Sequence, residues 1–205
     1  MVYLTNFLLQ PVYDLMQMLF IVALIIPVVI PAVVLGMMRG HLKRFTTFGL
    51  YKCFEGWPLG NWIFTRAVTL FAPYSGSIYA TIENLQPGSC TVLMHDRPWL
   101  RNPFNSLHAI ALANFAEMAT GIVGITTAEA ENGKVVGIPV SSSMKYHAKA
   151  RGTMRCRCDL PNQLPKEPGI YPMDLTCDVI DSKGLVVASA IFTWSFKVKE
   201  SKKKQ

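Results

Sequence analysis

Residues 101–121 read Arg-Asn-Pro-Phe-Asn-Ser-Leu-His-Ala-Ile-Ala-Leu-Ala-Asn-Phe-Ala-Glu-Met-Ala-Thr-Gly, and they predict the helix around which the rest of the chain folds. From Ala109 to Ala119 most side chains are apolar on every face of the helix, which is typical of an enclosed helix. Ser106 is a favourable N-cap residue and Gly121 a common stop signal. We therefore expect a buried helix that begins at Ser106 and ends at Gly121.

Three polar residues accompany this apolar stretch: Asn102, His108 and Glu117. Burying an unpaired amide or carboxylate is costly, so we expect each of them either to have a partner or to serve in a site. Glu117 follows His108 by nine residues, about two and a half turns, which places the two on opposite sides of a regular helix. They share one site only if His108 lies at an irregular helix start, or if a second chain completes the site.

The residues on both sides of this helix alternate in the manner of strands. Leu175, Cys177 and Val179 alternate with polar residues, the pattern of a strand with one buried face. One long helix combined with a run of antiparallel strands predicts an α+β fold in which the sheet wraps around the helix. We expect a short helix near residues 59–71 and strands at residues 77–83, 90–97, 134–149, 152–160, 173–182 and 185–198.

The N-terminal part of the chain has the composition of a membrane anchor. Met18–Met38 is an apolar run of 21 residues without a charged side chain. Such a helix crosses the roughly 30 Å of a bilayer's hydrocarbon, so residues 1–38 are predicted to hold a lead-in and a single transmembrane helix; a buried core helix is the alternative. No Lys or Arg precedes Arg39, so the positive-inside rule places the rest on the cytosolic or matrix side. Residues 39–65 are predicted to be a basic, aromatic connector on the membrane surface.

Composition excludes several classes of function. The five cysteines are an odd number without the spacing of a disulfide framework, which indicates reduced thiols. Cys156-x-Cys158 lacks the two further ligands of a zinc site, so we expect no metal. The net charge of +7 comes without a nucleic-acid-binding module, so we expect no nucleic-acid partner. The basic tail, residues 199–205, has the lysine placement of an endoplasmic-reticulum retrieval signal.

Five short motifs follow one another at compatible spacing: Ala72-Pro73-Tyr74-Ser75-Gly76, Arg97 to Asn102, His108 to Glu117, Tyr146 to Gly152, and Thr193-Trp194. Together they resemble the hotdog-fold thioesterase superfamily, in particular the branch grouped as domain of unknown function 4442, which is related to the phenylacetyl-CoA-type thioesterases. The resemblance covers roughly residues 66–198. It implies a hotdog fold for that segment, an antiparallel sheet wrapped on a central helix.

The resemblance also implies a site. In similar enzymes a loop Asn, a His at the helix start and a helical acid surround the thioester, and the acid often faces the partner subunit's site. Here these are Asn102, His108 and Glu117, with the backbone N–H groups near Ala109 polarising the carbonyl. Glu117 would be the general base for water, or the nucleophile. Each residue also has a purely structural alternative. Asn102 would stabilise the loop before the helix, His108 would hydrogen-bond a backbone carbonyl, and Glu117 would form an ion pair with Arg101 or Lys145.

The basic stretch Lys145, Lys149 and Arg151 has the charge to bind the phosphates of coenzyme A, although a solvated strand face explains it equally well. We therefore expect a membrane-anchored enzyme that hydrolyses acyl-CoA thioesters. It needs no cofactor beyond the coenzyme A of its substrate. Its partners would be membrane lipid and a second copy of the chain or another hotdog subunit, and its location the endoplasmic reticulum or the mitochondrial inner membrane.

Two positions depart from the family pattern. Family members commonly have Gly where this chain has Asn105 and Ile110, and a bulky Ile110 narrows the path to the helix backbone. These departures keep a second hypothesis open, a catalytically inactive accessory subunit of a membrane complex, for example one of a mitochondrial respiratory type.

Overall fold

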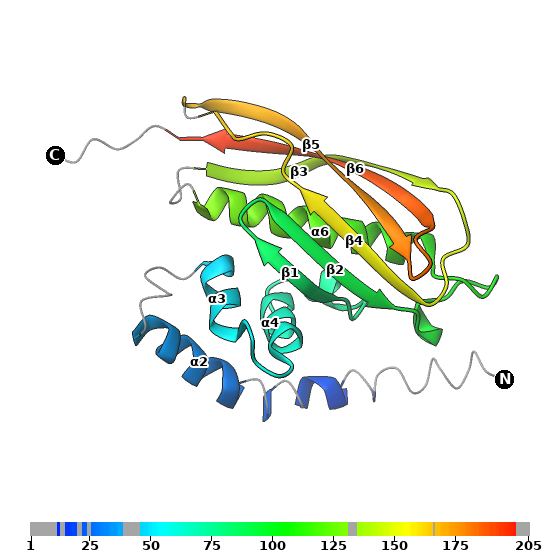
Figure 1. Ribbon diagram of the computed structural model, residues 1–205, viewed down its shortest axis with the longest axis horizontal. Helices are drawn as coiled ribbons and strands as arrows, with labels where there is room; N and C mark the ends of the chain where they lie inside the picture. Colours follow the sequence, from blue (N-terminus) through cyan, green and yellow to red (C-terminus); the bar gives the residue numbers. More distant parts are fainter. Residues whose placement is uncertain are drawn as a thin grey trace.

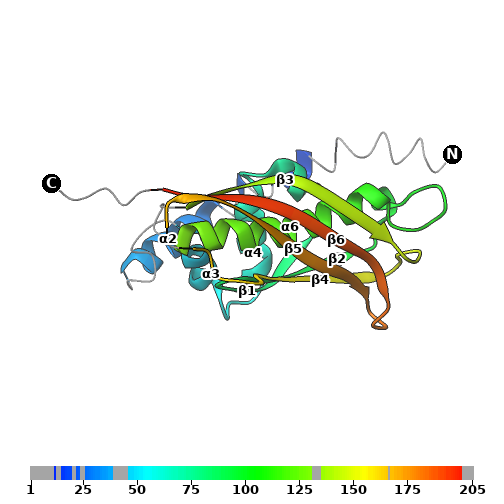
Figure 2. The ribbon, with the colours of Figure 1, turned by 90° about the horizontal axis from the view of Figure 1, so that it is seen from above.

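The computed structural model describes residue 12, residues 15–19, 22–23, 26–38 and 46–130, and residues 135–165 and 167–199. Its centre is a six-stranded antiparallel sheet in the order β1-β2-β4-β5-β6-β3, which curls around one long helix, α6 (Ala109–Ala130) (Figures 1 and 2). This is the hotdog arrangement that the resemblance implies. The strands are β1 (Thr81–Gln86), β2 (Ser89–His95), β3 (Val135–Tyr146), β4 (Thr153–Asp159), β5 (Gly169–Asp181) and β6 (Val186–Val198).

Alternation along the strands builds the core. In β4, Met154, Cys156 and Cys158 are fully buried, whereas the two residues between them, Arg155 and Arg157, are exposed. The buried side chains face α6, whose Phe115, Ala116 and Ala119 are fully buried as well. Burial raises the pKa of the Cys90 and Cys158 thiols, so these cysteines remain neutral packing groups.

Both ends of the central helix differ from the prediction. The helix begins at Ala109, because Ser106 bonds with Asn102 in the preceding loop and His108 provides the cap instead. It continues through Gly121 to Ala130. The glycines near its middle serve packing: a Cβ on Gly124 would lie 2.9 Å from the Trp194 ring, so a small residue is required there. A glycine that accommodates a neighbouring ring therefore does not end this helix.

Several predicted elements shift in the structure. Residues 73–76 form α5 (Pro73–Gly76), so β1 begins at Thr81 rather than at residue 77. β5 begins at Gly169, four residues before the start of the strand predicted at residues 173–182. The predicted helix near residues 59–71 is observed as α4 (Gly60–Thr69). A short 3₁₀ helix, η2 (Pro98–Leu100), precedes the α6 loop.

The segment predicted to be a membrane-surface connector, residues 39–65, includes α3 (Thr47–Phe54) and the first half of α4. Leu50 and Phe54 of α3 and Phe64 of α4 are buried in the same core as the sheet. The ring of Tyr51 meets that of Phe64 edge-on at 5.2 Å. The described part of this segment is therefore packed against the fold, and α3 lies beside one end of α6 (Figure 1).

The predicted transmembrane run, Met18–Met38, lies partly outside the described residues. Its described part includes α2 (Ile26–Met38), which contacts α3 and buries Ala32. Within the described residues, one helix is long and apolar enough to cross a bilayer, and that helix is α6. Since α6 is mostly buried inside the sheet, its apolar character is explained by the core.

Candidate functional site

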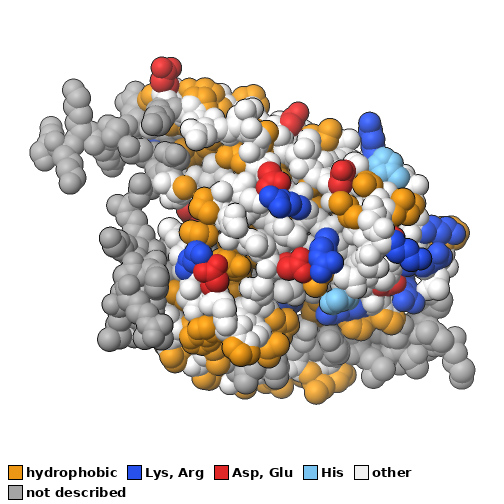
Figure 3. Space-filling model, in the orientation of Figure 1, with side chains coloured by type: hydrophobic (Ala, Val, Ile, Leu, Met, Phe, Trp, Pro, Cys, Tyr) orange, Lys and Arg blue, Asp and Glu red, His pale blue; other side chains and the backbone are white. Residues whose placement is uncertain are grey.

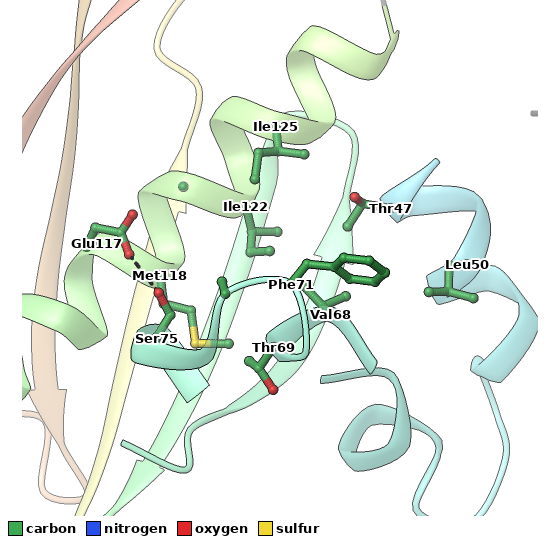
Figure 4. A pocket seen from close by; sticks show the side chains of 12 residues that line it. Thr47, Leu50, Val68, Thr69, Phe71, Ser75, Glu117, Met118, Ile122 and Ile125 are labelled. Atoms are coloured by element: carbon green, nitrogen blue, oxygen red, sulfur yellow. Dashed lines mark hydrogen bonds between the residues drawn. The ribbon is translucent and has the colours of Figure 1, made fainter. Parts of the chain in front are cut away.

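Glu117 lies in the middle of α6, at one end of an apolar pocket of about 340 Å³ (Figure 4). One wall is α6 itself and the opposite wall is α3. Phe71, in the short α4–α5 connection, is 85% exposed and lines the pocket. The remaining lining residues are mostly apolar: Thr47, Leu50, Val68, Thr69, Ala72, Ser75, Met118, Gly121, Ile122 and Ile125. A single carboxylate in such a lining is suited to chemistry on an apolar ligand.

The environment of Glu117 alters its protonation. Loss of hydration raises the pKa of the Glu117 carboxyl, and the Ser75 hydroxyl, which donates a 3.4 Å hydrogen bond to its Oε2, opposes part of that rise. A carboxylate with a raised pKa is a stronger base than one in water. The alternative in which Glu117 pairs with Arg101 is not observed, and Arg101 instead binds Asp96 at 2.7 Å. Glu117 is thus half-buried with a hydroxyl partner.

A second pocket, of about 350 Å³, lies at the start of α6 and is lined by Asn102, Ala109, Tyr146 and Lys149 among others. Tyr146 of β3 closes one side, and its hydroxyl donates to the Ala109 carbonyl at 3.1 Å. This pocket and the Glu117 pocket have no lining residue in common. One chain therefore brings Asn102 and Ala109 together but holds Glu117 apart from them.

Asn102 organises the loop before α6. Its side-chain oxygen accepts from the backbone N–H groups of Phe104 and Ser106 at 3.0 and 3.3 Å, and its amide donates to the Ser106 hydroxyl. Asn105 has a φ of 56°, a left-handed conformation that glycine and asparagine adopt most readily. Asparagine thus fills the position where the family commonly has Gly. Asn102 serves mainly to shape the loop.

The start of α6 has backbone N–H groups that no carbonyl of the helix itself accepts. The N–H of His108 is donated to the Leu100 carbonyl, and the N–H of Ile110 to Nδ1 of the exposed His108 ring. Ala109 is the first helical residue, so no carbonyl of its own helix accepts its N–H. Because His108 accepts at Nδ1, its neutral ring carries the proton on Nε2. The helix start can therefore offer the Ala109 N–H to an oxyanion.

The three basic residues predicted to bind phosphates are not equivalent. Lys149 lines the second pocket, and Arg151 donates from Nε to the Asn105 carbonyl at 2.8 Å, which fixes it beside the same loop. Lys145 directly precedes Tyr146 on β3, so its side chain points to the face of the sheet opposite the one on which Tyr146 lines the second pocket. Figure 3 shows Lys and Arg side chains gathered at the end of the molecule where the loops before α6 and before β4 lie.

Ser75, Phe71 and the α3 wall were not predicted as parts of a site. Ser75 stands in one of the motifs that carry the family resemblance, but a hydroxyl in such a motif has no characteristic spacing to Glu117. The α3 wall, with Thr47 and Leu50, comes from the segment that was predicted to be a membrane-surface connector, so no part of it was expected in a site. Within the described part of the chain no cluster of His, Cys, Asp and Glu side chains could hold a metal ion, Cys156 and Cys158 included.

The curled sheet on one central helix, with a carboxylate in an apolar pocket beside it, defines a protein of the hotdog-fold, thioesterase-like superfamily. The chain belongs to the family described as Domain of unknown function (DUF4442), which matches residues 60–196. A structural-genomics target is 26% identical over 68% of this chain and 91% of its own, with a TM-score of 0.60. A Pseudomonas aeruginosa protein of unknown function, labelled a probable thioesterase, is 21% identical over 65% and 91%, with a TM-score of 0.56. None of the curated proteins compared matches the chain.

Proposed function

We propose that the protein hydrolyses acyl-CoA thioesters, with coenzyme A entering only as part of the substrate. The observation that carries this proposal is Glu117, a half-buried carboxylate of raised pKa at the end of an apolar pocket. An acyl chain matches the pocket, and a carboxylate beside it suits the activation of water. The thioesterase label of a structural relative agrees with this chemistry.

In the proposed reaction Glu117 accepts a proton from water as the water oxygen attacks the thioester carbonyl carbon. The Ala109 N–H stabilises the oxyanion that forms on the carbonyl oxygen, assisted by the positive end of the α6 dipole. The carbon–sulfur bond then breaks, and the proton passes to the leaving thiolate of coenzyme A. His108, with its proton on Nε2, provides a second donor at the helix start.

Glu117 and Ala109 lie in separate pockets of one chain, so we propose that a second subunit completes each site. The second subunit is another copy of this chain or another hotdog protein. Strand β3 is an outer strand of the sheet, and the backbone groups on its open side are available for pairing. On neighbouring α6, Ile110 is 56% exposed and would be covered by such a partner. The carboxylate of one subunit would then face the helix start of the other.

We propose that the apolar run Met18–Met38 anchors the protein in an intracellular membrane, with the hotdog domain on the cytosolic or matrix side. The absence of a charge in that run and the basic residues after it support this proposal. The endoplasmic reticulum and the mitochondrial inner membrane are the two candidate locations. Contact with membrane lipid would suit acyl substrates, which partition there.

One observation favours the alternative of an inactive accessory subunit. Ile110 stands where family members commonly have Gly, and its side chain lies at the helix start that an oxyanion must approach. The test is the release of free coenzyme A by the detergent-solubilised full chain over a series of acyl lengths. Release that exceeds a buffer control supports the hydrolase. No release at any length, together with stoichiometric co-purification with a membrane complex, would support the accessory subunit.

The charge at the second pocket leads to a prediction about Lys149. Replacing Lys149 by Ala should raise KM for acyl-CoA about threefold to tenfold, because one phosphate contact is lost. The KM for the same acyl group on pantetheine, which lacks the nucleotide phosphates, should not change. Lys145→Ala is the matched control, since its side chain lies on the other face of β3. Equal effects of both variants would contradict a phosphate site at Lys149.

A further inference from the structure

The pocket that contains Glu117 is built partly from outside the family domain. The family match begins at residue 60, whereas Thr47 and Leu50, which line the pocket, belong to α3. Figure 4 shows Glu117 on α6 at one end of the pocket and Leu50 on α3 at the opposite end, with Val68, Phe71 and Ile122 between them. The segment before the hotdog domain therefore provides the wall that faces the carboxylate.

The wall is held in a defined position. Glu129, near the end of α6, accepts the backbone N–H of Thr47 at 2.7 Å and the Thr47 hydroxyl at 2.8 Å. Thr46 caps the same helix by accepting the Gly49 N–H at 3.0 Å. Leu50 is only 4% exposed, so its side chain is fixed by packing. These contacts tie the start of α3 to the end of α6 and set the distance between Leu50 and Glu117.

The dimensions and chemistry of the pocket indicate its occupant. The volume of about 340 Å³ falls in the range of roughly 300–1,000 Å³ that is typical of small-molecule sites, so the pocket has room for a hydrocarbon chain. Between Ser75 and Thr47 the lining side chains offer one hydroxyl, that of Thr69, which already donates to the Arg66 carbonyl at 3.2 Å, so a polar ligand would lose most of its hydration without replacement. A straight hydrocarbon chain satisfies both conditions.

We infer that α3 limits the length of the acyl chain that this protein accepts: the pocket binds a straight acyl chain, and Leu50 closes the end of the pocket opposite Glu117 (Figure 4). This inference rests on the proposed function for the identity of the ligand as an acyl thioester. The thioester carbonyl lies by Glu117 and the chain runs along α6 toward α3. Chains shorter than the pocket leave it partly empty, and longer chains meet Leu50.

The test measures binding separately from turnover. Full-length protein carrying Glu117→Gln is titrated in detergent with acyl-CoA esters from two to eighteen carbons. Affinity should rise roughly fourfold with each added methylene, as apolar burial requires, until the chain fills the pocket, and then stop rising. Leu50→Ala should move this limit to longer chains, and Leu50→Phe, which extends into the open pocket, should move it to shorter ones.

The chain-length limit should move in opposite directions in the two Leu50 variants. General destabilisation cannot explain such a result, because it would weaken binding of every chain length in both variants. If Leu50→Ala does not fold, the inference is tested by Leu50→Phe alone, through the expected shift of the limit to shorter chains. Leu185→Ala, a change of the same kind at an exposed position of the β5–β6 turn, is the matched control. An unchanged length limit in both Leu50 variants would overturn the inference.

The outcomes also separate this inference from the proposed function. If the protein with native Glu117 releases coenzyme A but the chain-length limit does not change in the Leu50 variants, the proposed hydrolysis is supported and the role of α3 in limiting chain length is overturned. If the chain-length limit shifts in the Leu50 variants but the native protein shows no turnover, the role of α3 is supported and the proposed hydrolysis is overturned. If no acyl-CoA of any length binds, both are overturned.

Discussion

Glu117→Gln is expected to lower kcat for acyl-CoA hydrolysis by about 10²–10⁴-fold, the range that a positioned general base contributes. Glutamine keeps the size of the side chain and can still accept from Ser75, whose hydroxyl lies 3.4 Å from Glu117 Oε2. It cannot accept a proton from water. The KM should change little, because the apolar lining that binds the chain is intact. Steady-state release of coenzyme A measures both constants.

Glu83→Gln is the matched control for this substitution. Glu83 lies on β1, where it accepts two hydrogen bonds from Arg155 at 2.9 Å, and it lines neither of the two pockets. Its replacement removes a partly exposed ion pair of small energetic value and should leave kcat unchanged. Turnover that persists in Glu117→Gln would remove Glu117 from the mechanism.

Glu117→Gln should also stabilise the fold at neutral pH. Burial raises the pKa of Glu117 above its ordinary value, so the folded protein binds a proton more tightly than the unfolded chain. The free energy of unfolding therefore decreases as pH rises from the ordinary carboxyl pKa through the raised one. A glutamine side chain at this position carries no charge to desolvate. Glu117→Gln should thus raise Tm at neutral pH and have no such effect at acid pH, where Glu117 is protonated.

The sequence predicted the elements that arise from periodicity. The alternation around Leu175, Cys177 and Val179 predicted a strand with one buried face, and these side chains are buried in β5. The apolar stretch after Ala109 predicted the central helix. The long strands that follow it were expected within a few residues of their observed bounds, because the alternation of buried and exposed positions is a local property.

The features that depend on tertiary contacts were not predicted. Gly121 reads as a helix stop, but the helix passes through it because the Trp194 ring packs against the small residues on that side. The basic, aromatic sequence around α3 reads as a surface connector. The bonds between Thr47 and Glu129, 82 positions apart, together with the burial of Leu50 and Phe54, make it a wall of the pocket. Asn102 illustrates the same limit, because its loop bonds require the folded turn.

Ala109→Pro is expected to remove the oxyanion donor while keeping the helix. Proline lacks a backbone N–H and is favoured at the first helical position, where its φ already suits the helix. The preceding residue, His108, is at the cap, where extended backbone is usual and is compatible with a following proline. Loss of one such donor should lower kcat by about 10²–10³-fold. Ala109→Ser keeps the N–H and should retain activity, and circular dichroism checks the fold of both.

Mixing two inactive variants then tests whether sites are shared between subunits. In a dimer of one Glu117→Gln chain and one Ala109→Pro chain, one site receives native Glu117 from the second chain and native Ala109 from the first. The other site receives both substitutions. Random exchange of subunits in a two-fold dimer makes half of the dimers mixed, so activity should return to about a quarter of the native level. If each chain held a complete site, every site in the mixture would carry one substitution and no activity would return. The separation of the two pockets in one chain favours recovery.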